Sequence, residues 1–172
     1  MRRTAILTVL IASLATLAYV PVALADSPSF DLKHGNTAVA LDSSGQAVAS
    51  DGSLTVNFRE TGLGNTPNPV NYTLTADADA LYACQNGGGN FPTDPKKQDV
   101  TSAVRADGKF NPKNGAVTGT LTITPPASTL NCPGGQHPVL ASITYTNVKI
   151  TDTDHNVSAT FNGPFSRTFF TI

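Results

Sequence analysis

The sequence predicts an all-β fold, a sandwich of about eight or nine strands, and three observations support this prediction. Threonine occurs 20 times from residue 26 onward, whereas glutamate, a good helix former, occurs once, at Glu60. The 14 Gly and 12 Pro residues recur along the chain and leave few windows for three helical turns. Apolar and polar residues alternate over many short segments, as in strands with one buried face.

The first 25 residues have the pattern of a secretory signal peptide. Arg2 and Arg3 precede an apolar run, and Ala23-Leu24-Ala25 closes it with an A-x-A cleavage pattern. Removal of these 25 of the 172 residues leaves one domain of 147 residues, 26–172. It keeps nine of the eleven Lys and Arg residues and all twelve acids, a net charge of −3. We expect a secreted protein that binds no nucleic acid and has no membrane span in the mature chain.

The first half of the domain alternates around clear turn signals. Residues 37–41 form a short expected strand, and Asp51-Gly52 is a turn dipeptide inside an expected hairpin at 47–59. Proline residues at 67 and 69 bound the next strand at its start. Further strands are expected at 70–76 and 80–84, followed by a long Gly-rich loop at 85–97.

The second half continues the same pattern. A strand at 100–105 is expected to end at Ala106-Asp107-Gly108, and Asn114-Gly115 is the turn before the next one. The longest expected strand changes its two-residue phase, which requires a bulge near Thr146-Asn147. Phe169-Phe170 would place one ring on each sheet face, one for packing and one for a partner or edge contact, or both rings in the core. The remaining strands are expected at 117–124, 139–150, 157–161 and 165–172.

Cys84 and Cys132 are the only cysteines, so a secreted context predicts one disulfide between them. Each abuts a Gly-rich loop, and a disulfide would hold both loops at one end of the domain. The pair is either a staple for two flexible loops or the support of a binding surface built from them. The expected contacts of such a surface are Asn86, Asn90, Phe91, Gln136 and His137.

Signals for metal binding and catalysis are weak. Asp152, Asp154 and Asn156 are spaced like the opening of a calcium loop, but the later glycine and glutamate of that pattern are absent, so a solvated turn is favoured. No metal or other cofactor is expected. Glu60 precedes a turn and is expected at an exposed rim. The histidines form no zinc pattern, and no G-x-S-x-G motif is present, so no enzyme is expected.

The segment from Glu60-Thr61-Gly62-Leu63-Gly64 through Thr122-Ile123 contains a Gly-Leu turn, a Tyr-bearing strand, a Cys-ended strand, an Ala-Asp-Gly turn and a Thr-rich strand. In this it resembles small secreted immunoglobulin-like sandwich proteins of bacterial type, loosely the neocarzinostatin-like chromophore carriers. The resemblance implies an immunoglobulin-like Greek-key topology. Those carriers have two disulfides where this chain has one cysteine pair, and the resemblance transfers no functional residue.

Three functions follow from these patterns. The first is a non-enzymatic extracellular or cell-surface binding domain of unknown ligand, acting through the two Gly-rich loops. The second is a carrier that holds an apolar small molecule in a cleft between the sheets. The third, and least favoured, is a hydrolase that uses Glu60 or the aspartates.

Overall fold

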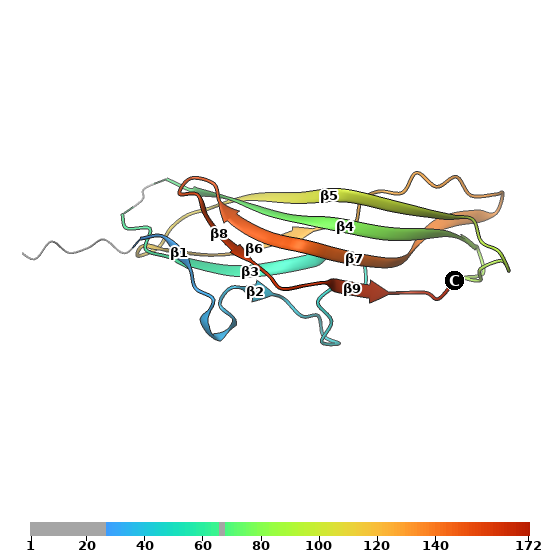
Figure 1. The fold of residues 1–172 in the computed structure, drawn as a ribbon, viewed down its shortest axis with the longest axis horizontal. Coiled ribbons are helices and arrows are strands. Elements are labelled where there is room, and N and C mark those ends of the chain that lie inside the picture. Colours follow the sequence, from blue (N-terminus) through green and yellow to red (C-terminus); the bar gives the residue numbers. More distant parts are fainter. Residues whose placement is uncertain (1–26, 66–67) are drawn as a thin grey trace, which may run out of the picture.

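The computed structural model describes residues 27–65 and 68–172, and the expected signal peptide at 1–25 lies outside them. The described residues form nine strands and one 3₁₀ turn, η1 (Lys33–Gly35), in two antiparallel sheets packed face to face (Figure 1). The predicted all-β sandwich is confirmed. The strands are β1 (Ser29–Phe30), β2 (Ala38–Val39), β3 (Leu54–Thr61), β4 (Val70–Asn86), β5 (Lys97–Phe110), β6 (Ala116–Ile123), β7 (Gln136–Asp152), β8 (Val157–Thr160) and β9 (Phe165–Thr168).

The chain crosses between the sheets three times. In the smaller sheet β3 is central, with β6 on one side and the short β1 and β2 on the other. The larger sheet has the order β5-β4-β7, and both β8 and β9 pair with β7. Crossings follow β3, β5 and β6, so neighbours in sequence often lie in different sheets. Within 27–65 and 68–172, no helix is long and apolar enough to cross a membrane.

Several predicted strand ends are wrong. The last strand, expected at 165–172, ends at Thr168. The expected strands at 70–76 and 80–84 are one strand, β4, because Asp77 and Asp79 both lie on its solvent face and leave the alternation intact. The expected turn at Ala106-Asp107-Gly108 is part of β5, which continues to Phe110. A Cβ on Gly108 would lie 2.7 Å from the Phe110 ring, so this glycine makes room for an aromatic side chain rather than a turn.

The predicted bulge in the longest strand is confirmed. Thr75 of β4 pairs with Lys149 of β7 and Asp77 pairs with Thr146, so two β7 residues, Asn147 and Val148, oppose one β4 residue. Asn147 has a φ of 53°, a conformation that asparagine tolerates better than most residues. The bulge lets Val148 and Ile150 turn inward together with Tyr145, and all three are buried.

The core lies between the sheets and is centred on aromatic rings. Phe58 contacts Tyr72 at a ring-centroid distance of 4.6 Å and Phe110 at 5.1 Å. A Cβ on Gly119 would lie 2.6 Å from both phenylalanine rings, so this strand position has no room for a larger residue. These side chains fill the space between the sheets at this level of the sandwich.

The two sheets differ in length, and this difference creates the end of the molecule that carries the disulfide. β3 and β6 have 8 residues each, whereas β4 and β7 have 17. At one end β4, β5 and β7 therefore extend beyond the smaller sheet. These extended ends of β4, β5 and β7 are called the overhang below, and the smaller sheet does not reach their inner face. The crossover segment 124–135, which connects β6 to β7, lies against this face instead.

Candidate functional site

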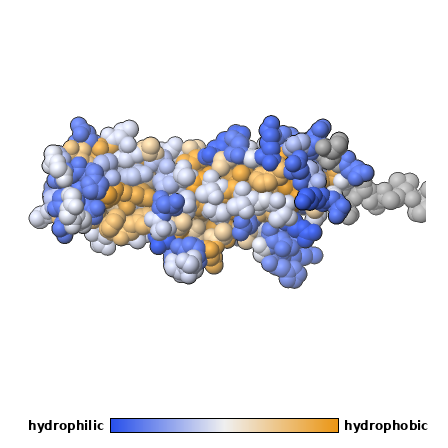
Figure 2. All heavy atoms as spheres, turned by 180° about the vertical axis from the view of Figure 1, so that it is seen from behind, coloured by the Kyte–Doolittle hydropathy of each residue, from blue (hydrophilic) through white to orange (hydrophobic). Residues whose placement is uncertain are grey.

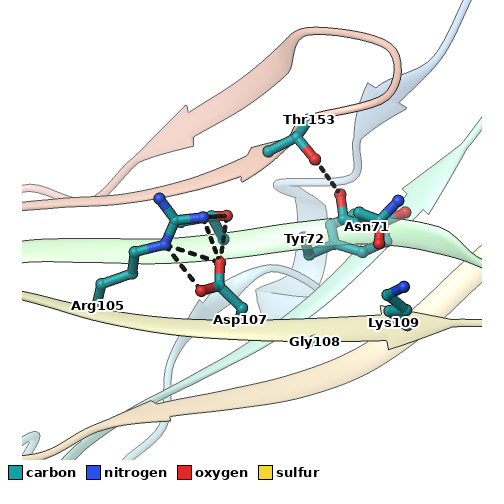
Figure 3. A pocket seen from close by; sticks show the side chains of 8 residues that line it. Asn71, Tyr72, Arg105, Asp107, Gly108, Lys109 and Thr153 are labelled. Carbon is teal, nitrogen blue, oxygen red and sulfur yellow. Dashed lines mark hydrogen bonds and ion pairs between the residues drawn. The ribbon is translucent and has the colours of Figure 1, made fainter.

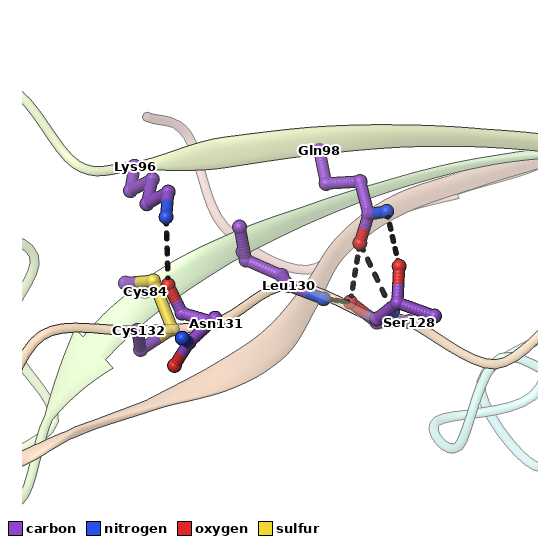
Figure 4. Close-up of a disulfide and its surroundings, with 8 residues drawn as sticks. Cys84, Lys96, Gln98, Ser128, Leu130, Asn131 and Cys132 are labelled. Atoms are coloured by element: carbon purple, nitrogen blue, oxygen red, sulfur yellow. Dashed lines mark hydrogen bonds between the residues drawn. A yellow bond between two sulfur atoms is a disulfide. The ribbon is translucent and has the colours of Figure 1, made fainter.

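A disulfide holds the crossover segment 124–135 on the overhang. Cys84 is buried near the end of β4, and its sulfur is bonded to that of Cys132 in the segment, which confirms the predicted pairing (Figure 4). Pro126, Ser128, Leu130 and Cys132 are half-buried, whereas Ala127, Thr129 and Asn131 are exposed. The segment therefore buries alternate side chains like a strand, although it forms no ladder with either sheet.

Side chains of the larger sheet fix the path of this segment through hydrogen bonds. The Tyr82 hydroxyl donates to the Pro126 carbonyl at 2.7 Å. Gln98 accepts from Ser128 Oγ at 2.9 Å and from the Thr129 amide at 3.1 Å, and its Nε2 donates to Thr129 Oγ1 at 2.8 Å (Figure 4). Lys96 Nζ donates to the Asn131 carbonyl at 2.9 Å. The disulfide and these bonds make the crossover segment an ordered layer.

The predicted contact residues lie at this same end. Asn86 and Gln136 are partners at the ends of β4 and β7, and His137 pairs with Gln85. The Asn86 side-chain oxygen accepts from the amides of Gly88 and Asn90, which closes the first Gly-rich loop. The ladder between β4 and β7 brings these residues together beside the disulfide, and their role in binding stays a prediction.

An apolar pocket lies beside these loops. Phe91, at the end of the first loop, contacts Phe170 edge to face at a centroid distance of 5.3 Å. Phe170 is 40% exposed, whereas Phe169 packs against the core. This agrees with the alternative in which one ring packs in the core and the other does not. The pocket has a volume of about 320 Å³, opens to solvent, and is lined by Ser50, Asp51, Val139, Leu140, Phe169 and Phe170.

Only Phe91 of the predicted contacts reaches this pocket, through its contact with Phe170. Val139 and Leu140 of β7, which line the pocket, were not singled out from the sequence because they have the pattern of ordinary strand residues. The double phenylalanine near the chain end was the available signal. Figure 2 shows the molecule from behind, with the disulfide-bearing end at the left, and apolar residues reach the surface there among polar ones.

The predicted calcium candidates form a turn. The buried Asp152 accepts from the amides of Asp154 and His155 through Oδ1 and contacts His155 Nδ1 at 2.6 Å through Oδ2. Asp154 accepts from the backbone and side chain of Asn71. Asn156 completes the turn with a φ of 56°. Among the described residues no three His, Cys, Asp or Glu side chains gather in a metal-binding group, and calcium binding stays untested.

Glu60 is not at an exposed rim, and this prediction is wrong. Its side chain follows Leu54, Val56 and Phe58 to the inner face of β3 and has 0% exposure. Burial raises the pKa of Glu60 to about 7, the hydrogen bond from Tyr72 opposes this shift, and the neighbouring Asp152 adds to it. Asp152 is also at 0% exposure. A raised carboxyl pKa beside a second acid suits general acid chemistry, but both carboxyls are closed to solvent.

A groove lined by polar side chains on the outer face of the larger sheet is another concave surface. It has a volume of about 500 Å³ and lies over β4 and β5 near Thr153 (Figure 3). Arg105 binds both carboxylate oxygens of Asp107 at 2.8 and 2.9 Å and donates to Thr73 Oγ1 at 3.1 Å. Arg105 and Asp107 thereby form an ion pair within the groove, which Lys109 also lines.

Comparison of the chain with protein-family models, with curated proteins and with solved structures finds no match. The resemblance to the neocarzinostatin-like carriers stays an expectation from the sequence.

Proposed function

We propose that this protein is a secreted, non-enzymatic binding domain with an immunoglobulin-like strand connectivity, and that its ligand docks at the disulfide-bearing end. The observation that carries the proposal is the open apolar pocket bordered by the partly exposed Phe170. Apolar pockets with a few polar groups at the rim are the usual form of small-ligand and side-chain sites. The Ser50 and Asp51 side of the pocket supplies such a rim.

The rigidity of this end supports the same proposal. Loops that bind are most effective when a firm scaffold holds them, because less freedom is then lost on binding. Here the Cys84–Cys132 disulfide and the hydrogen bonds of Gln98 fix the crossover segment beneath the loops. A disulfide also fits an oxidising compartment, as the expected signal peptide requires.

The other two functions have less support. A carrier needs a cleft between the sheets, and the aromatic core of Phe58, Tyr72 and Phe110 occupies that space in the described part of the sandwich. A hydrolase needs acids that a substrate can touch, and Glu60 and Asp152 have no exposed surface. We assign this acid pair a structural role at the junction of the two sheets.

The proposal is tested with the dye 1-anilinonaphthalene-8-sulfonate, whose fluorescence rises in apolar pockets. We expect saturable binding to the oxidised protein and at least a severalfold weaker affinity for Phe170→Ala. Leu32→Ala is the matched control, since Leu32 is 61% exposed and lies outside this pocket. Equal dye binding by the Phe170 variant and the wild type would overturn the proposed site.

A further inference from the structure

β5 is a long strand with one free edge. In the described part of the chain it pairs with β4 alone, and it has 14 residues, compared with 8 in β6. The opposite edge of the larger sheet is divided between the two four-residue strands β8 and β9. A long free edge offers unpaired backbone N–H and C=O groups to another strand.

The charges of β5 alternate in sign along its outer face. Lys97, Asp99, Arg105, Asp107 and Lys109 are all exposed and share the same parity, so they lie in one row. The centre of the strand is small: Ser102 and Ala103 are exposed, and the Ser102 hydroxyl donates to the carbonyl of Ala103 at 3.1 Å. Another backbone can approach closely at this centre, and the charges on either side determine which strand fits.

We propose that β5 pairs antiparallel with the β5 of a second copy of this chain, in the register that places Ser102 opposite its own copy. In this register Lys97 faces Asp107 of the other copy, and Asp99 faces Arg105. Arg105 and Asp107 bond to each other within one chain, so the second copy adds a further partner of opposite sign to each. Two-fold symmetry repeats each pair. Residues directly opposite in an antiparallel ladder lie about 4.5–5.5 Å apart at Cα, within reach of these side chains.

The inner face agrees with the same register. Val100 faces Val104 of the other copy, and both valines are half-buried in the single chain. Pairing residues of equal parity also keeps the two outer faces on one side of the combined sheet. The dimer would then have one continuous sheet running through both copies.

Three other registers fit the charges of β5 less well. Two of them place like charges opposite each other, and the third pairs fewer opposite charges. Centring the pair on Ala103 places Lys97 opposite Lys109 and Asp99 opposite Asp107, and centring it on Thr101 places Lys97 opposite Arg105. Like charges directly opposite one another destabilise a ladder. Centring on Val104 leaves Asp99 and Lys109 as the only opposed charges of opposite sign.

Cysteine cross-linking tests both the interface and its register. The natural cysteines are bonded to each other, so a single added cysteine reports only on its own position. Ser102→Cys should form a disulfide-linked dimer under mild oxidation at least about tenfold faster than Ala103→Cys, because only residue 102 meets its own copy. Equal rates, or a faster reaction at residue 103, would overturn the register.

Charge reversal tests the attraction by sedimentation equilibrium. Asp99→Lys should weaken the dimer at least about tenfold, since it turns two attractive pairs into repulsive ones. Exchange of the two charges in Asp99→Arg/Arg105→Asp should restore it. Asp79→Lys, the same charge change on the neighbouring β4, is the control and should leave the dimer intact. A wild-type protein that sediments as a monomer at every concentration contradicts the proposal.

Discussion

The hydroxyl of Tyr72 donates a hydrogen bond of 2.6 Å to Oε2 of Glu60, and this bond joins the two sheets inside the sandwich. Glu60 belongs to β3 of the smaller sheet and Tyr72 to β4 of the larger one. The other carboxylate oxygen, Oε1, is buried without a hydrogen-bond partner among the described residues. A proton on Glu60 relieves the cost of burying a charge here.

Glu60→Gln should stabilise the protein above neutral pH. Folding raises the pKa of Glu60 from 4.5 to about 7, so between these values the folded state holds a proton that the unfolded chain has released. The free energy of unfolding of the wild type therefore falls as the pH rises through this range. Glutamine resembles the protonated acid and does not titrate.

Urea unfolding of both proteins checks this prediction. Near pH 4.5 the two should have the same free energy of unfolding, and at about pH 8 the variant should be the more stable. A difference in the free energy of unfolding between the two proteins that stays the same from pH 4.5 to pH 8 would contradict a raised pKa of Glu60 in the folded state.

Replacement of both cysteines by serine should lower the free energy of unfolding by about 4 kcal/mol, because the disulfide closes a long loop in the unfolded chain. The two residues are 48 positions apart. Urea unfolding measures the loss. Amide hydrogen exchange should show a loss of protection in the core that matches the lower global stability, and a larger loss at 124–135 and the overhanging ends of β4, β5 and β7. A loss no larger at those segments than in the core would contradict a local clamp.

Gln98→Ala should loosen the crossover segment without unfolding the domain. The substitution removes three hydrogen bonds to Ser128 and Thr129. Partly exposed bonds of this kind contribute about 1 kcal/mol each or less, so a total loss of about 1–2 kcal/mol is expected. Faster amide exchange at 126–131 checks the effect, and exchange equal to the wild type would show that the disulfide alone holds the segment.

Gly119→Ala should cost about 1–3 kcal/mol through overpacking, since the new Cβ would lie 2.6 Å from ring atoms of Phe58 and Phe110. Gly134→Ala is the matched control, because no atom lies within 4 Å of a Cβ placed there. The thermal midpoint of each variant measures the difference. Equal midpoints would show that the aromatic core moves aside at no cost.

The fold could be predicted from the sequence because most strands obey a two-residue alternation and the turns carry Gly, Asn or Asp. The disulfide followed from the presence of two cysteines in an expected secreted chain. The burial of Glu60 could also have been predicted, because Glu60 has the same parity as the inward-facing Leu54, Val56 and Phe58. The turn that follows Glu60, and the rarity of carboxyl groups in a core, favoured an exposed position instead.

The candidate site was less predictable because it depends on contacts between distant segments. Val139 and Leu140 meet Phe169 and Phe170 only once β9 has paired with β7. The packing of the crossover segment 124–135 against the overhang was also not predictable from the sequence. Pro125-Pro126 correctly marks the end of β6 in the sequence. The residues after it bury alternate side chains but form no ladder bonds, and a sequence pattern does not distinguish such a segment from a loop.

The most direct test of the proposed binding surface is an amide NMR titration of the oxidised protein with indole, a small apolar probe. The account predicts saturable shifts that are largest at Val139, Leu140, Phe169 and Phe170, and their loss in Phe170→Ala. Largest shifts in the polar groove around Arg105 and Asp107, or no saturable shifts anywhere, would contradict it.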